Sequence, residues 1–303
     1  MAILPQAKEV RKIELLSGIH RMNETNETRT AEEIAAARAE LERKTTGELF
    51  ALTLEGEEDD GAPWEAVTVL RLRGTSEVFD VAREYSQSEN PKARARGLSV
   101  LAQLGAGKPE VERPFIAESV SIAIGHLQDS DREVVSSAAW ALSHLGTEPA
   151  VVALIGLRSH PDPDVRRAVA CCIELRKHAE AVPILITLME DENEVVRDWA
   201  TFALGEFNLL ENGERRYLDS PEIRAALHGR LEDTYEEARR EAIWGLAKRR
   251  DSLGLKLLLE DLESESCWSG DESAAEEILG AEANTPVDEL CRGLHRLLTV
   301  ASK

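Results

Sequence analysis

The sequence is poor in aromatic residues and in cysteine. Its 303 residues include 5 Trp, 3 Tyr, 5 Phe and 4 Cys, and the cysteines form no Cys-x-x-Cys pair. This spacing fits neither a disulfide framework nor a zinc site, so we expect reduced, packed thiols and no metal. No segment approaches 18 consecutive apolar residues, and the first residues lack the apolar run of a signal peptide. We therefore expect a cytoplasmic protein without a membrane partner.

Basic residues are also scarce. Asp and Glu number 57 against 36 Lys and Arg, which gives a formal charge of -21. A field of this sign repels phosphate before local contacts form and speeds association with a basic partner, so no nucleic-acid partner is expected. The chain also has no Gly-rich phosphate loop, no His-Glu-x-x-His and no nucleophile elbow. These absences favour a protein without catalytic residues, and we predict no cofactor.

An internal repeat organises the middle of the chain. Five thirteen-residue segments share an apolar or small first residue, a small centre and an apolar ninth residue, and their starts are 41, 31, 31 and 42 residues apart. Equal steps flanked by longer ones indicate stacked repeats with loop insertions. Second amphipathic helices are predicted between them at 149–158, 181–189, 222–231 and 252–262. The repeated segments open at Ala93, Val134, Val165, Val196 and Ala238.

Acidic turns precede the repeated helices, as in Asp162-Pro163-Asp164 before Val165-Arg166. Carboxylates at these places cap free backbone N–H groups and favour the positive helix end. The phrase Asp-x-x-Val-Arg followed by an Ala-rich helix resembles the HEAT repeat, in the short form of phycobilisome-lyase-type repeats. The resemblance covers roughly residues 64–262. It implies an all-α fold, a right-handed α-α superhelix of about five to seven helical pairs with capping helices.

The ends of the chain differ from the repeats. We expect a flexible tail at 1–29 and one solenoid at 30–303, in which 30–62 form an N-terminal helix and acidic loop. The repeats then occupy 63–262 and a C-terminal cap occupies 263–303. Thr285 and Pro286 are predicted to open the last helix. Its apolar stripe comprises Val287, Leu290, Cys291, Leu294, Leu297 and Leu298.

A candidate binding surface follows from the helical period. At 100° per residue, positions 3, 4, 7 and 11 of the repeated helix lie together on one flank, beside the core stripe. The HEAT resemblance implies that this flank lines the concave side, and position 7 is aromatic in three of the five repeats. Aromatic and charged residues together are typical of recognition surfaces, although packing between helices is an alternative. The predicted partner-binding residues are Trp140, His144, Arg167, Asp198, Trp199, Phe202, Glu206, Arg240, Trp244 and Lys248.

Three functions are compatible with this surface. The leading prediction is a non-catalytic scaffold or adaptor whose groove engages a basic polypeptide, for example a bacterial immunity protein that holds a basic toxin or effector. The resemblance to phycobilin lyases implies a chromophore-binding protein as an alternative. A HEAT-like alkylpurine DNA glycosylase is the third possibility, and the acidic charge opposes it.

Overall fold

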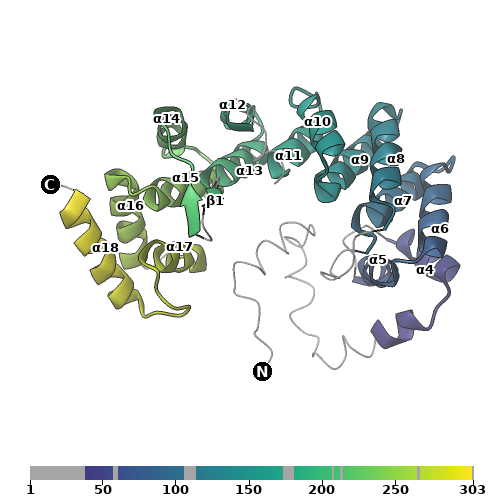
Figure 1. Ribbon diagram of the computed structural model, residues 1–303, viewed down its shortest axis with the longest axis horizontal. Helices are drawn as coiled ribbons and strands as arrows, with labels where there is room; N and C mark the ends of the chain where they lie inside the picture. The colour runs from purple at the N-terminus through teal and green to yellow at the C-terminus, as the bar shows by residue number, and fades with distance from the viewer. Residues whose placement is uncertain are drawn as a thin grey trace. The chain divides into compact units, whose positions relative to one another are not determined.

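The computed structural model confirms an all-α repeat fold, with one short hairpin as an addition (Figure 1). The chain divides into two compact units, Met1–Glu174 and Leu175–Lys303, and each is described by itself. The predicted tail at 1–29 lies outside the described residues, and the prediction of one array at 30–303 stays a prediction. The structure describes residues 38–56, 61–105, 114–172, 181–206, 208–211, 214–264 and 267–301.

The first unit contains three of the five repeated helices. These are α7, α9 and α11, and α9 packs against both of the others. Its core is apolar and includes Phe50, Leu70 and Leu101, each no more than 1% exposed. The first unit comprises α4 (Thr46–Thr53), α5 (Gly61–Arg73), α6 (Ser76–Ser86), α7 (Pro91–Gln103), α8 (Ile116–Gly125), the 3-10 turn η2 (His126–Gln128), α9 (Arg132–Leu145), α10 (Glu148–Ile155) and α11 (Pro163–Cys171).

The second unit contains the other two repeated helices, α13 and α15, packed against each other. The contact is a close one, because a Cβ on Gly245 would lie 2.9 Å from the Cα of Gly205. The second unit comprises α12 (Ala181–Leu188), α13 (Glu194–Gly205), β1 (Asn208–Glu211), β2 (Glu214–Tyr217), α14 (Pro221–Arg230), α15 (Glu236–Lys248), α16 (Ser252–Glu263), α17 (Ser269–Leu279) and α18 (Val287–Ala301).

The fourth repeat, whose step to the next is 42 residues against 31 for the two before it, contains the hairpin. Strands β1 and β2 pair antiparallel, with Asn208 opposite Tyr217. The hairpin is fixed by Arg249, whose guanidinium donates to the carbonyls of Leu218, Gly205, Gly245 and Leu204 at 2.8–2.9 Å. Burial lowers the pKa of Arg249 to about 10, so this side chain stays charged at neutral pH. The sequence pattern predicted an insertion here but not its strands.

The predicted C-terminal cap is present. The last helix, α18, packs on α16 and α17 and buries Leu290 and Leu294 completely. The remaining residues of the predicted stripe, Val287, Cys291, Leu297 and Leu298, pack around the same cluster while partly exposed. The cap covers apolar surface of the last repeat that would otherwise face water.

Candidate partner-binding surfaces

An arginine at the second position of the repeated helix joins consecutive repeats at two places, Arg94 and Arg197. In the second unit, Arg197 donates to the carbonyls of Asp191 and Glu192 in its own turn, at 3.0 and 3.2 Å. It also forms a two-bond ion pair with Asp233 in the next turn, at 2.8 and 2.9 Å. Arg94 repeats this geometry in the first unit, with Asp129 as its carboxylate at 2.8 and 2.9 Å. The acidic turns therefore bind the preceding repeat as well as capping helices.

These ion pairs keep the turn carboxylates ionised. The hydrogen bonds from Arg94 lower the pKa of Asp129 to about 2, although burial acts in the opposite direction. Arg197 likewise lowers the pKa of Asp233 through its hydrogen bonds. A carboxylate that a guanidinium holds in this way is a structural link, because both of its oxygens are already bound.

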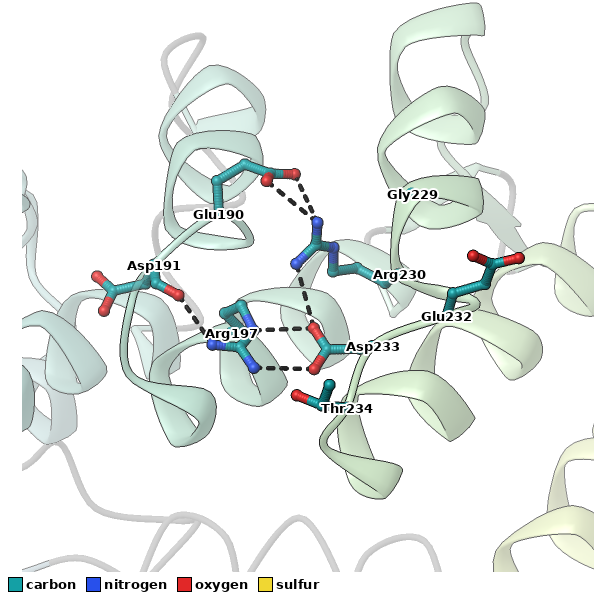
Figure 2. Close-up of a pocket in the computed structure, with 8 residues that line it drawn as sticks. All are labelled: Glu190, Asp191, Arg197, Gly229, Arg230, Glu232, Asp233 and Thr234. Atoms are coloured by element: carbon teal, nitrogen blue, oxygen red, sulfur yellow. Dashed lines mark hydrogen bonds and ion pairs between the residues drawn. The ribbon is translucent and has the colours of Figure 1, made fainter.

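A polar cavity of about 280 Å³ lies over the junction that Arg197 and Asp233 form (Figure 2). Arg230 crosses it and donates to Glu190 at 2.9 and 3.1 Å and to Asp233 at 3.1 Å. Figure 2 shows these three side chains and Arg197 pointing toward one another, while Glu232 points away. Arg197 and Arg230 are neutralised by Asp233 and Glu190 within the protein. We therefore interpret this cavity as part of the junction between repeats. Its lining is Glu190, Asp191, Arg197, Gly229, Arg230, Glu232, Asp233 and Thr234.

Three predicted binding residues meet in the first unit. Arg167 of α11 lies over the ring of Trp140 of α9, with its Cζ 5.1 Å from the ring centroid. His144, one turn after Trp140, has its Nδ1 2.9 Å from the Trp140 carbonyl oxygen. All three side chains are half-buried. They form a continuous aromatic and cationic surface across two repeated helices.

A second aromatic pair lies on α13 in the second unit. Trp199 and Phe202 contact edge to face, with ring centroids 6.1 Å apart and planes at 80°. Both residues are half-buried, as is Asp198 beside them. The pair therefore places two aromatic rings beside a carboxylate on one helix.

Glu206 and Lys248 belong to a buried polar cluster under the hairpin. Lys248 forms ion pairs with Glu206 and with Glu277 of α17, and its side chain is 7% exposed. The hydroxyl of Tyr217 donates to Glu277, and Lys248 Nζ lies 5.6 Å from the Tyr217 ring centroid. Lys248, Glu206 and Glu277 each have a partner of opposite charge within the cluster. Because Tyr217 contacts both Lys248 and Glu277, the cluster anchors β2 to α15 and α17.

Trp244 and Arg240 are core residues of the last repeat. Trp244 is 5% exposed and donates its ring N–H to Asp271 of α17 at 2.8 Å. Arg240 is 7% exposed, donates to the same carboxylate at 3.0 Å and stacks on Trp268, 4.4 Å from its centroid. Trp244 and Arg240 thus pack between helices. Partner binding stays a prediction for the half-buried residues.

Sequence reasoning missed Asp271, Glu277 and Tyr217, which organise these two clusters. Asp271 is fully buried, although it lies in a first helical turn where a carboxylate is expected to be a surface cap. The available signal was weak: Trp268, Asp271 and the acidic α17 follow the last repeat closely in sequence. A local pattern does not show that α17 returns to contact α15.

Comparisons with known proteins agree with the repeat pattern. A family model described as HEAT repeats matches residues 152–214. Protein YibA of Escherichia coli K12 is 28% identical over 221 residues, which are 72% of this chain and 75% of YibA. The X-ray structure of Escherichia coli YibA superposes with a TM-score of 0.66 at 24% identity, covering 90% of this chain and 99% of that one. A structure of Kap95p, which binds RanGDP, superposes with a TM-score of 0.53 at 12% identity and covers 95% of this chain and 39% of that one.

The fold is an all-α helical-repeat solenoid, and residues 152–214 match the HEAT-repeat family model. The chain is similar in sequence to YibA over 72% of its length and similar to it in fold. Within the described residues, no helix is long and apolar enough to cross a membrane. The described part of the chain also contains no group of three or more His, Cys, Asp or Glu placed to hold a metal ion.

Proposed function

We propose that the protein is a non-catalytic scaffold that binds a polypeptide on the exposed faces of its repeated helices. The observation that carries this proposal is the half-buried state of Trp140, Trp199 and Phe202. Aromatic rings are costly to leave in water and dominate the energetics of protein interfaces. The Arg167 stack on Trp140 and the edge-to-face pair on α13 hold these rings in place before any partner arrives.

The partner in this proposal is basic. The chain carries a formal charge of -21, which accelerates encounter with a cationic protein and disfavours nucleic acid. Asp198 lies one residue before Trp199 on α13, so the ring pair lies next to an acidic side chain. One concrete form is a cytoplasmic bacterial immunity protein that holds a basic toxin or effector.

The test begins with a pull-down from the source cell, followed by calorimetry with the purified partner. The double variant Trp199→Ala, Phe202→Ala should weaken binding by more than about 2 kcal/mol, roughly thirtyfold in Kd. Leu253→Ala is the matched control, since Leu253 is 41% exposed in the same unit but lies on α16. Equal affinity of the double variant and the control would refute the assignment of this surface.

The two alternatives predict different ligands for the same protein. A chromophore-binding protein would change the absorption spectrum of an added bilin, and Arg167 beside Trp140 offers a cation for a propionate. A DNA glycosylase would bind labelled duplex tightly at low salt and lose affinity steeply as salt rises. Either result would displace the scaffold proposal.

A further inference from the structure

Trp268 is an exposed aromatic residue that the predicted surface does not include. It lies between α16 and α17 and is 40% exposed. Among the described residues, the other exposed large apolar side chains are aliphatic: Ile124, Val152 and Leu253. An exposed indole ring in a chain with so few aromatic residues calls for an explanation other than core packing.

The ring is held rigidly. The backbone N–H of Trp268 donates to Asp271 at 2.8 Å, and the same carboxylate binds the ring N–H of Trp244. Arg240 lies over the Trp268 ring at 4.4 Å and is itself fixed by Asp271 and by Glu236 at 2.9 Å. A side chain fixed in this way loses little conformational entropy when a partner binds, which favours affinity.

The surroundings of the ring are acidic. Residues 257–291 contain 11 Asp and Glu and no Lys, Arg or His. Burial raises the pKa of the Cys267 thiol next to Trp268, and the charges of Asp271, Glu272 and Asp261 raise this pKa further. Glu272 lies four residues after Trp268, one helical turn along α17. Burial and the Asp271 carboxylate also raise the pKa of Asp261. An approaching cation would relieve this repulsion between carboxylates.

We propose that Trp268, with Asp261 and Glu272, forms a docking point for a Lys or Arg side chain of a basic polypeptide. The exposed ring surface attracts the ammonium or guanidinium group by a cation–π contact, and the two carboxylates supply the opposite charge. The charge of Arg240, which lies over the ring, is balanced by its ion pairs with Asp271 and Glu236, and the indole is still 40% exposed. The inference rests on the proposed function for the class of partner, but it concerns a different surface.

The experiment measures the anisotropy of a fluorescein-labelled octalysine peptide with the full-length protein at low salt. Trp268→Ala should raise Kd about two- to fivefold, and Trp268→Phe should raise it less because a ring remains. Leu253→Ala is the matched control for the loss of an exposed apolar side chain. Circular dichroism checks that each variant stays helical.

The carboxylates have their own matched pair. Glu272→Gln should weaken octalysine binding more than Glu232→Gln, which removes the same charge from an exposed side chain in the α14–α15 turn. Equal effects of the two glutamine variants, or an unchanged Kd for Trp268→Ala, would overturn the docking point. If Trp199→Ala, Phe202→Ala abolishes binding of the natural partner while Trp268→Ala leaves octalysine affinity intact, the scaffold proposal stands and this inference fails.

Discussion

Trp140 and Trp244 occupy the same position of their repeated helices but have different surroundings. Trp140 is half-buried, and Arg167 of the next repeated helix lies over its ring. Trp244 is 5% exposed, and its ring N–H is bound by the fully buried Asp271. The difference comes from α17, which packs against α15 in the second unit. A repeat position is therefore exposed or buried according to the element that follows its repeat.

The largest expected effect distinguishes these two rings. Trp244→Ala should lower the free energy of unfolding by about 3–5 kcal/mol, because it empties a packed site and leaves Asp271 with one donor fewer. Trp140→Ala should cost less than about 1.5 kcal/mol, since its ring is partly in water already. Urea denaturation followed by circular dichroism measures both values. Similar losses for the two variants would show that Trp140 is as deeply packed as Trp244.

The buried carboxylate is the next target. Asp271→Ala should cost about 3 kcal/mol, because Arg240 would lose its fully buried counter-charge and keep only Glu236, and the Trp244 N–H would lose its acceptor. Asp271→Asn keeps the shape and one acceptor oxygen, so it should cost less. Glu272→Ala, one residue later and partly exposed, is the control. Equal thermal stability of the Asp271 and Glu272 variants would contradict the central role of this carboxylate.

Most of the fold was predictable from the sequence, for a physical reason. Helices bury one stripe, so the period of apolar residues predicted the repeated helices, their partners at 149–158 and 252–262, and the stripe of α18. Caps are local as well: Asp131 accepts from the backbone N–H groups of Glu133 and Val134, as the acidic turns indicated. These features depend on residues within one or two turns of each other.

The candidate site was predictable only in part, because burial depends on contacts between distant segments. Lys248 and Glu206 are 42 residues apart and form a half-buried ion pair, and Lys248 also pairs with Glu277 of α17. The Arg94–Asp129 pair spans 35 residues, and nothing in either local pattern distinguishes a cap from an inter-repeat link. Trp199 and Phe202 are half-buried on α13, and their role in binding stays a prediction.

The inter-repeat ion pairs should behave alike in the two units, in contrast to the tryptophans. Asp129→Asn and Asp233→Asn should each cost about 2 kcal/mol, because each removes charge-assisted hydrogen bonds at a mostly buried carboxylate. The pKa of both groups is lower in the folded protein than in the unfolded chain. Each ion pair therefore contributes stability above the unfolded pKa of about 4 and loses it as the pH falls through the lowered folded pKa of its carboxylate, which is about 2 for Asp129. Denaturation at several pH values measures this slope, which should be shallower in each variant.

The smallest expected effect concerns the contact between Arg167 and Trp140. A double-mutant cycle of Trp140→Ala and Arg167→Ala should give a coupling energy of about 0.5–1 kcal/mol, the range of a cation–π contact at a partly exposed site. Arg167 also pairs with Asp164 at 3.2 Å, so Asp164→Asn is needed to separate the exposed ion pair from the stack. A coupling near zero would mean that the guanidinium does not hold the ring, and the first unit would then present a mobile tryptophan. A coupling above about 2 kcal/mol would mean that the pair is desolvated. Trp140 would then be closer to the buried Trp244 in its surroundings than its exposure indicates.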